Sequence, residues 1–512
     1  MRISPLPRIR LLPPILASIR AACTWLRGAW GHLRGAWGHL SHRNRDWAVN
    51  ILIGVAIEIG LQLALDAPIV VAARNWALDT AMIDDAAVRT LRRGHIAPQD
   101  LAFIDVDEET WRDPLWGNSE PYRAPRDGLL TLIDYAIERE ARYIVLDVII
   151  EGSNDPDDAR FAEQIEQRAT RLKPSQHILF VRTLREPLPG MQDRLAPELR
   201  PSALDDVIKC HPEQLHAVAP YFRVSRDGVL RDWQMWRTGC RRSTVGEIAA
   251  GNAERGKGHW EILPSVQLAI AALMLSDRAK FPWNKPAEEG SCIIDLAAYK
   301  SSGIPVSTFR SDDDAMWKWL PKSGLPHASE VEKPSDATIP LTNRIFFKFR
   351  YRQEPSVLLI PALAILKQTP HSDVAKDGVV VIGQSFEAAH DLHATPIGVM
   401  PGPMVLINSL ESMWKPGFLQ EPGCASRLAI LGTSIVVVGF IFAYRDYVIA
   451  SLVILTLFVP LLIILNFVLL QHGIWMDFAI PLLGMYLHKL IEELKAYRDR
   501  AQHAGPHRKG GD

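Results

Sequence analysis

Three apolar runs near the C-terminal end constrain what this chain can fold into more than any other feature. Residues 428–444 and 447–470 contain no charged side chain, and each is long enough, or nearly so, for a helix that crosses a bilayer. Within hydrocarbon every backbone polar group needs an internal partner, so continuous apolar runs favour helices. Residues 474–488 form a shorter run that includes Asp477 and Pro481. The pattern predicts a membrane unit of three helices; a buried hairpin in a water-soluble protein is the alternative.

A fourth apolar run, residues 47–73, lies near the other end of the chain. Residues 1–46 before it are rich in arginine, and the positive-inside rule therefore keeps the N-terminus in the cytoplasm. With three more spans the C-terminus returns to the cytoplasm, and residues 489–512 are also basic. We therefore expect a multi-pass membrane protein with four spans, both termini in the cytoplasm and its large domain on the outer side. If residues 474–488 did not span, the basic tail would lie outside.

The basic N-terminal tail contains a seven-residue duplication, in which the sequence Leu-Arg-Gly-Ala-Trp-Gly-His begins at Leu26 and again at Leu33. On a helix this repeat would align leucine and tryptophan along one stripe, which suits an anionic membrane surface. Its glycines weaken a helix, and a duplication without a role is the other interpretation.

The first predicted span carries polar residues at helical spacing. Glu58 and Gln62 are four positions apart, so they share one face of a helix. An ionisable group at mid-membrane usually faces other helices or water. The pattern predicts a packing face against the C-terminal helices, where Asn466 is a candidate polar partner. The alternative is a protonated Glu58 that the bilayer tolerates.

The 74–427 segment between the first span and the others is too long for a connector, so it predicts a folded extracytoplasmic domain. Apolar runs and apolar periodicity alternate along it. They predict strands at 101–106, 143–150, 177–181, 344–350 and 379–383 and helices at 126–140, 155–171, 263–275 and 405–414, with Pro264 in a first helical turn. Strands that alternate with helices predict an α/β domain with a mostly parallel sheet and flanking helices, beside an α-helical membrane part.

Several charged residues stand where the predicted strands end. Asp105, Asp107 and Asp147 follow or close two strands, Arg126 opens the helix between them, and Asp391 follows a further strand. Ligands of parallel sheets collect beyond the carboxyl ends of strands, so these residues are candidates to bind a small ligand or a cation. The alternative is that the aspartates cap loops and pair with Arg126 to hold the fold.

Other chemistry has less support in the sequence. Paired carboxylates can do acid–base work, but the sequence has no serine nucleophile elbow, zinc-type spacing or phosphate loop, so we predict no enzyme, no cofactor and no metal. His390 and His393 flank Asp391 and leave a metal interpretation open. A disulfide between Cys210 and Cys240 stays open too. The net charge of −1 gives no reason to expect nucleic acid as a partner.

The segment resembles the extracellular sensory domains of the CHASE type-2 family. The matching pieces, in family order, are Phe103–Trp111, Arg123–Arg126, Ala141–Val148, Arg226–Arg231, Val380–Gly383, Asp391, Thr395–Pro396, Pro401–Gly402 and Asn408. One leading span, a large outer domain and three closing spans also resemble the family. Long extra segments at 185–215 and 281–340 depart from it.

The resemblance implies a sensor in the lipid bilayer of a bacterial inner membrane. Its large domain lies in the periplasm and detects an unknown small-molecule or protein signal there. Family members commonly continue into a cytoplasmic output domain, but residues 491–512 hold no output motif, so we expect the signal to pass to a separate cytoplasmic or membrane effector protein. A structural or assembly subunit that docks an extracytoplasmic partner is the alternative. The oligomeric state stays open, a homo-oligomer included.

Overall fold

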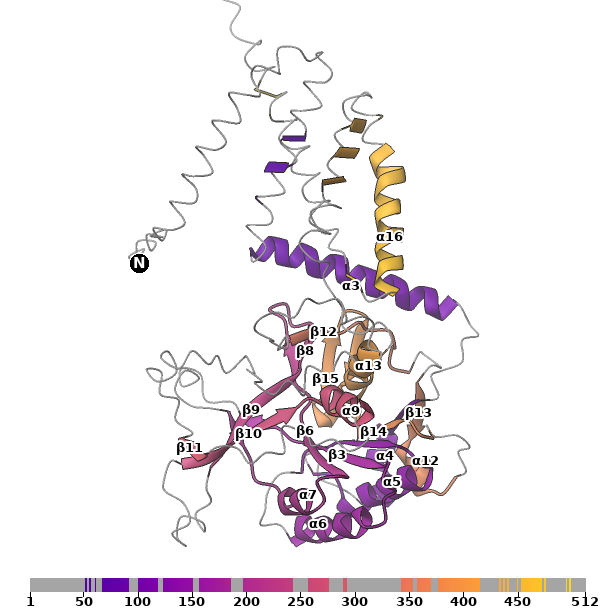
Figure 1. Cartoon of the computed structure of the whole chain (residues 1–512). Coiled ribbons are helices and arrows are strands. Elements are labelled where there is room, and N and C mark those ends of the chain that lie inside the picture. Colours follow the sequence, from indigo (N-terminus) through magenta and orange to yellow (C-terminus); the bar gives the residue numbers. More distant parts are fainter. Residues whose placement is uncertain are drawn as a thin grey trace, which may run out of the picture. The chain divides into compact units, whose positions relative to one another are not determined.

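The computed structural model of the chain (Figure 1) divides into two compact units. The terminal unit comprises residues 1–77, 422–466 and 476–512, and the central unit comprises residues 78–421 and 467–475. The residues that the structure describes are 51–52, 55–56, 60, 67–91, 100–117, 123–150, 156–185, 197–242, 257–275, 289–291, 342–352, 357–369, 376–414, 432–433, 436–437, 440–441, 449, 453–471, 474–475, 494 and 497–498.

A six-stranded parallel sheet forms the middle of the central unit, as the alternating pattern predicts. Its strands are β1 (Leu101–Val106), β2 (Tyr143–Asp147), β3 (His177–Val181), β6 (Leu215–Val218), β13 (Leu358–Pro361) and β14 (Val379–Gln384). The spatial order is β13-β1-β14-β2-β3-β6. The late strand β14 thus lies between the early strands β1 and β2, and it is buried along most of its length because helices cover both faces.

Helices cover the two faces of this sheet (Figure 1). On one face, α5 (Arg126–Glu138), α6 (Pro156–Ala169), α7 (Asp205–Cys210) and α12 (Ala362–Leu366) share an apolar core with the sheet. That core takes alternate strand residues such as Ile104, Leu146 and Ile382. On the other face, α13 (Gly402–Trp414) packs against β1 and β14, and α9 (Val266–Leu275) packs against α13. The intervening strand residues, Asp105 among them, therefore point towards the α13 side.

Smaller elements complete the central unit. A five-stranded sheet has the order β11-β10-β9-β5-β4, a three-stranded sheet has the order β12-β8-β7, and β15 pairs with β16. Their bounds are β4 (Leu184–Arg185), β5 (Glu198–Leu199), β7 (Phe222–Val224), β8 (Leu230–Gln234), β9 (Trp236–Arg242), β10 (Lys257–Pro264), β11 (Glu289–Ser291), β12 (Thr342–Arg344), β15 (Leu392–Thr395) and β16 (Gly398–Pro401). Short helices occur at α4 (Glu108–Arg112), η1 (Pro114–Trp116) and η5 (Glu387–Ala389).

Two predicted elements differ from the structure. Pro264 ends β10, where it pairs with Trp236, so its predicted place in a helical turn is wrong. The helix starts later because the Ser265 hydroxyl accepts a hydrogen bond from the backbone N–H of Leu268 and caps it. The predicted strand at 344–350 is also wrong, since β12 ends at Arg344 and the buried segment after it joins no sheet.

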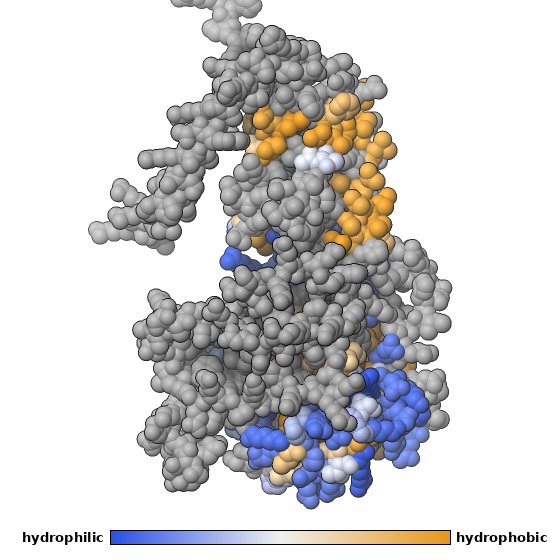
Figure 2. Space-filling model, viewed as in Figure 1, coloured by the Kyte–Doolittle hydropathy of each residue, from blue (hydrophilic) through white to orange (hydrophobic). Residues whose placement is uncertain are grey.

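Two further helices contribute residues to both units. Helix α3 (Pro68–Leu91) begins inside the predicted first span, 47–73. Helix α16 (Val459–Gln471) follows a π-helical turn at Ile454–Phe458, within the predicted span 447–470. Figure 2 shows apolar side chains gathered along α16, which exposes Leu461, Ile464 and Val468 to its surroundings. Among the described residues, no helix combines the length and the apolar character that crossing a membrane requires.

Candidate functional site

The carboxyl ends of three neighbouring strands meet at one edge of the parallel sheet. Asp105 of β1 lies in register with Gly383 of β14, and Gly383 lies in register with Asp147 of β2. In a parallel sheet such partners point to the same face, here the α13 side. The structure therefore brings two of the predicted site residues to the same level of the sheet, with one strand between them.

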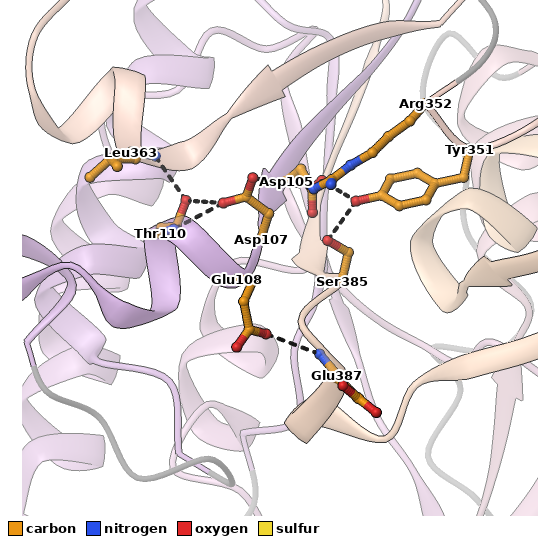
Figure 3. A network of polar contacts seen from close by, with 9 residues as sticks. All are labelled: Asp105, Asp107, Glu108, Thr110, Tyr351, Arg352, Leu363, Ser385 and Glu387. Atoms are coloured by element: carbon orange, nitrogen blue, oxygen red, sulfur yellow. Dashed lines mark hydrogen bonds and ion pairs between the residues drawn. The ribbon is translucent and has the colours of Figure 1, made fainter.

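Asp105 is the most deeply buried of these acids, with 1% of its surface exposed. The phenol of Tyr351 donates a hydrogen bond of 2.6 Å to Oδ2 of Asp105 and lies 2.8 Å from Oγ of Ser385 (Figure 3). Oδ1 of Asp105 is buried and has no hydrogen-bond partner among the described residues. Burial raises the pKa of Asp105, and the hydrogen bonds from Ser385 and Tyr351 oppose this rise. The site thus holds a buried acceptor with unused hydrogen-bonding capacity.

Asp107 has a local structural task as well as a place in this network. Its Oδ1 accepts hydrogen bonds from the backbone N–H of Thr110, at 2.9 Å, and from the Thr110 hydroxyl, at 2.8 Å, which caps α4. The Thr110 hydroxyl in turn accepts from the backbone N–H of Leu363 at 3.2 Å (Figure 3). Oδ2 of Asp107 lies 3.3 Å from Nη2 of Arg352. One carboxylate therefore joins the helix cap to the site.

Arg352 lies over both acids. Its Nη2 is 3.8 Å from Oδ2 of Asp105 as well as near Asp107, and 54% of its side chain is exposed. Its backbone φ is 60°, in the left-handed region that residues other than glycine seldom adopt. Such a conformation costs on the order of 1–3 kcal/mol and persists where the surroundings impose it. Here it directs the guanidinium towards the two carboxylates.

An asparagine of α13 holds the segment that carries Tyr351 and Arg352. Oδ1 of Asn408 accepts hydrogen bonds from the backbone N–H groups of Lys348, at 2.8 Å, and Phe349, at 2.9 Å. Nδ2 of Asn408 donates to the carbonyl of Phe349 at 3.0 Å. These backbone groups are buried, and the Asn408 side chain supplies the hydrogen bonds that a neighbouring strand would otherwise make. It thereby fixes the position of the segment that leads to Tyr351 and Arg352.

A second acidic cluster lies at the end of β2. Burial, and after it the negative charge of Asp391, raise the pKa of Asp147 to about 8. Oδ1 of Asp391 also lies 2.9 Å from Nε2 of the His393 imidazole, within hydrogen-bonding distance. Its carboxylate lies against the Cα of Gly402, the first residue of α13, where a Cβ would come 2.2 Å from Oδ2. The structure therefore brings Asp147 and Asp391 close enough to interact electrostatically.

Pro403 separates the two clusters. A Cβ at Gly383 would lie 2.3 Å from Cγ of Pro403 and 3.4 Å from Cβ of Asp147, so the proline ring covers the middle strand. Asp105 and Asp147 thus belong to two distinct clusters of polar residues. Within the described residues no set of three His, Cys, Asp or Glu side chains is placed to hold a metal ion.

Arg126 lies apart from both clusters. Its Nε is 2.6 Å from Oδ1 of Asp158, and both side chains are buried. Its Nη1 donates to the carbonyl of Ala124 at 3.1 Å. The structure therefore pairs Arg126 with an acid of α6, and neither Asp105 nor Asp147 is its partner.

Sequence reasoning did not single out Tyr351, Arg352 or Ser385. Ser385 directly follows a strand, which is a signal that could have been used, whereas nothing local marks Tyr351. Of the predicted membrane-packing residues, Glu58 and Gln62 lie outside the described part of the chain, as does the duplicated tail. Asn466 is 8% exposed, and its Oδ1 has no hydrogen-bond partner within the described residues. Cys210 is exposed and carries a free thiol.

Comparison with known proteins gives one match. The family model described as CHASE2 domain matches residues 57–443, which is more than half of the chain. None of the curated proteins matches the chain. None of the solved structures matches it either.

Proposed function

Because this chain belongs to the CHASE2 domain family, we propose that it is a membrane-bound sensor whose central domain receives its signal outside the cytoplasm. CHASE2 is a family of sensory domains, so the chain carries a sensory domain. The observation that carries the proposal is the extent of the match. It covers the whole α/β domain and reaches into the apolar runs on both sides of it, at 47–73 and 428–444.

The proposed membrane arrangement has four spans in a bacterial inner membrane, with both termini in the cytoplasm and the domain in the periplasm. The uncharged runs and the basic segments beside them support this arrangement. The apolar side chains that α16 exposes support it too, because lipid is the surrounding that such a surface suits. The proposal also gives the chain no catalytic role of its own. Its signal passes to a separate effector protein.

The proposed signal-binding site is the group around Asp105. Three segments from distant parts of the chain meet there, namely the end of β1, the turn at Tyr351–Arg352 and the end of β14. The unpartnered Oδ1 of Asp105 would accept a hydrogen bond from a ligand donor. A ligand shifts a conformational equilibrium only by binding one state more tightly, and a group that joins three segments offers such a difference.

Affinity purification of the full-length protein from its native membrane, in mild detergent, tests the effector. A cytoplasmic kinase, cyclase, protease or ATPase that copurifies is the expected result. Recovery of envelope proteins alone would favour the assembly subunit and contradict the sensor with a separate effector.

Thermal unfolding of the purified full-length protein with a panel of small polar compounds tests the site. A compound that raises the Tm of the wild type should lose its effect on Asp105→Asn and Arg352→Ala. The matched control is Arg160→Ala, which removes an exposed arginine that pairs with Asp127 elsewhere on the domain. A compound that stabilises all variants equally would place its binding away from Asp105.

A further inference from the structure

Helix α3 exposes a straight apolar stripe. Ile69, Trp76 and Ile83 are 71%, 67% and 42% exposed. Each follows the previous one by seven positions, which is two helical turns, so the three side chains lie along one line. A helix on a water-soluble surface normally shows polar side chains on its exposed side. The stripe therefore indicates that something apolar covers it.

The opposite face of the same helix is already covered. Val70, Leu78 and Met82 are buried there. Beside them, Asp79 forms a two-pronged ion pair with Arg231 of β8, with Nε–Oδ1 at 2.9 Å and Nη2–Oδ2 at 2.7 Å. This pair fixes which side of α3 turns away from the protein, so the helix cannot rotate to hide the stripe without breaking it.

A second copy of the chain is one conceivable cover, because seven-residue spacing is typical of coiled coils. Such a seam also needs apolar residues at the positions three after the stripe. These positions hold Ala72, Asp79 and Ala86, and Asp79 is bound to Arg231 within its own chain. A buried charge that already has a partner elsewhere does not fit the centre of a helical dimer.

Phospholipid fits better. The proposed first span, 47–73, overlaps the first residues of α3, which begins at Pro68, so the stripe starts at the end of that span. Tryptophan with aliphatic neighbours is the typical anchor of the membrane–water interface. Among residues 68–85 of α3, whose exposure the structure describes, no exposed position holds lysine or arginine, so attraction to anionic lipid is not required.

We propose that the stripe of Ile69, Trp76 and Ile83 lies in the interfacial layer of a phospholipid bilayer, with α3 along the membrane surface. This inference rests on the proposed function as a membrane protein. Through Asp79 and Arg231 it would attach strand β8 of the sensory domain to a helix that lipid holds.

The test uses the full-length protein in nanodiscs of zwitterionic phosphatidylcholine. In a background without the five native cysteines, a nitroxide is attached at Ile69→Cys, Trp76→Cys or Ile83→Cys. Collision with oxygen reports lipid, and collision with a water-soluble nickel chelate reports water. Matched controls are Val224→Cys, an exposed apolar position on β7, and Asp84→Cys, an exposed position on α3 beside the stripe.

The expected result is an oxygen-to-nickel collision ratio that is severalfold higher at all three stripe positions than at Val224 and Asp84. Equal ratios at stripe and control positions would mean that water covers the stripe, and low collision with both reagents would mean that protein covers it. Either outcome overturns the inference. Carbonate extraction of native membranes separates the two proposals. If carbonate removes the chain from the membrane, the proposed membrane anchoring is wrong as well. If the chain is retained but water contacts the stripe, only the interfacial position of α3 is wrong.

Discussion

The phenol of Tyr351 donates a 2.6 Å hydrogen bond to the carboxylate of Asp105, although the two residues are 246 positions apart in the chain. This hydrogen bond lies at the edge of the sheet where the parallel strands end, and its acceptor is a buried carboxylate. It also ties the segment after β12 to the first strand of the parallel sheet. The pair is therefore both a structural contact and the centre of the proposed signal site.

Tyr351→Phe should lower the free energy of unfolding by about 1–3 kcal/mol, because it leaves the buried carboxylate without its phenolic donor. Denaturant titration of the purified protein measures this loss. The control is Tyr143→Phe, since the hydroxyl of Tyr143 is buried and has no hydrogen-bond partner among the described residues. Equal effects of the two changes would show that the Tyr351 contact contributes nothing specific.

The Asp147 carboxyl should make stability depend on pH. Its folded pKa, about 8, is above the ordinary value of 3.8, so folding favours the protonated form. Its contribution is then most favourable at low pH and is lost as the pH rises from 3.8 towards 8. Asp147→Asn cannot lose a proton, so its stability relative to the wild type should increase across this range.

Denaturant titrations at several pH values measure the difference between Asp147→Asn and the wild type. Asp206→Asn is the control, because the Asp206 side chain is 94% exposed at the start of α7. A difference that stays constant with pH would contradict the raised pKa of Asp147.

Gly383→Ala should destabilise the protein by about 1–3 kcal/mol, because the new methyl group would collide with the ring of Pro403. Adding Pro403→Ala should recover part of the loss, since it removes Cγ, the nearest atom. Unfolding free energies of the two single variants and the double variant measure the coupling. If the changes in unfolding free energy of the two single variants summed to that of the double variant, there would be no steric coupling between the two residues.

Arg126→Met should cost about 3–5 kcal/mol, because it leaves Asp158 charged and buried without its partner. Adding Asp158→Leu should recover most of this loss. The exposed pair of Arg160 and Asp127 provides the control, and Arg160→Ala should change stability by less than about 0.5 kcal/mol. If ligands still stabilise the double variant, Arg126 is no part of the signal site.

Local patterns predicted the elements whose apolar periodicity is strong. The strands at 101–106 and 177–181 and the helices near 126–140 and 155–171 are confirmed, because each has a continuous apolar run or one clear apolar face. The position of β14 between β1 and β2 could not be predicted, since several strand orders satisfy the same pattern. The helix of the first crossover lies on the face opposite Asp105, which is why Arg126 does not reach that acid.

The candidate site was predictable only in its acids. Asp105 and Asp147 lie at the carboxyl ends of their strands, and that position alone marks them. Tyr351 and Arg352 depend on Asn408, which holds their segment from a helix far along the chain. Such a partnership leaves no trace in local composition. The membrane-packing residues Glu58 and Gln62 remain predictions.

Strand β14 comes late in the chain, and this has a consequence for folding during synthesis. When the ribosome has made β1, α5 and β2, the two strands lack the one that belongs between them. Their inner edges have open backbone groups until residues 379–384 emerge. The early part of the domain therefore cannot fold as a finished unit, and a nascent chain stalled before β14 should be open to proteases and chaperones.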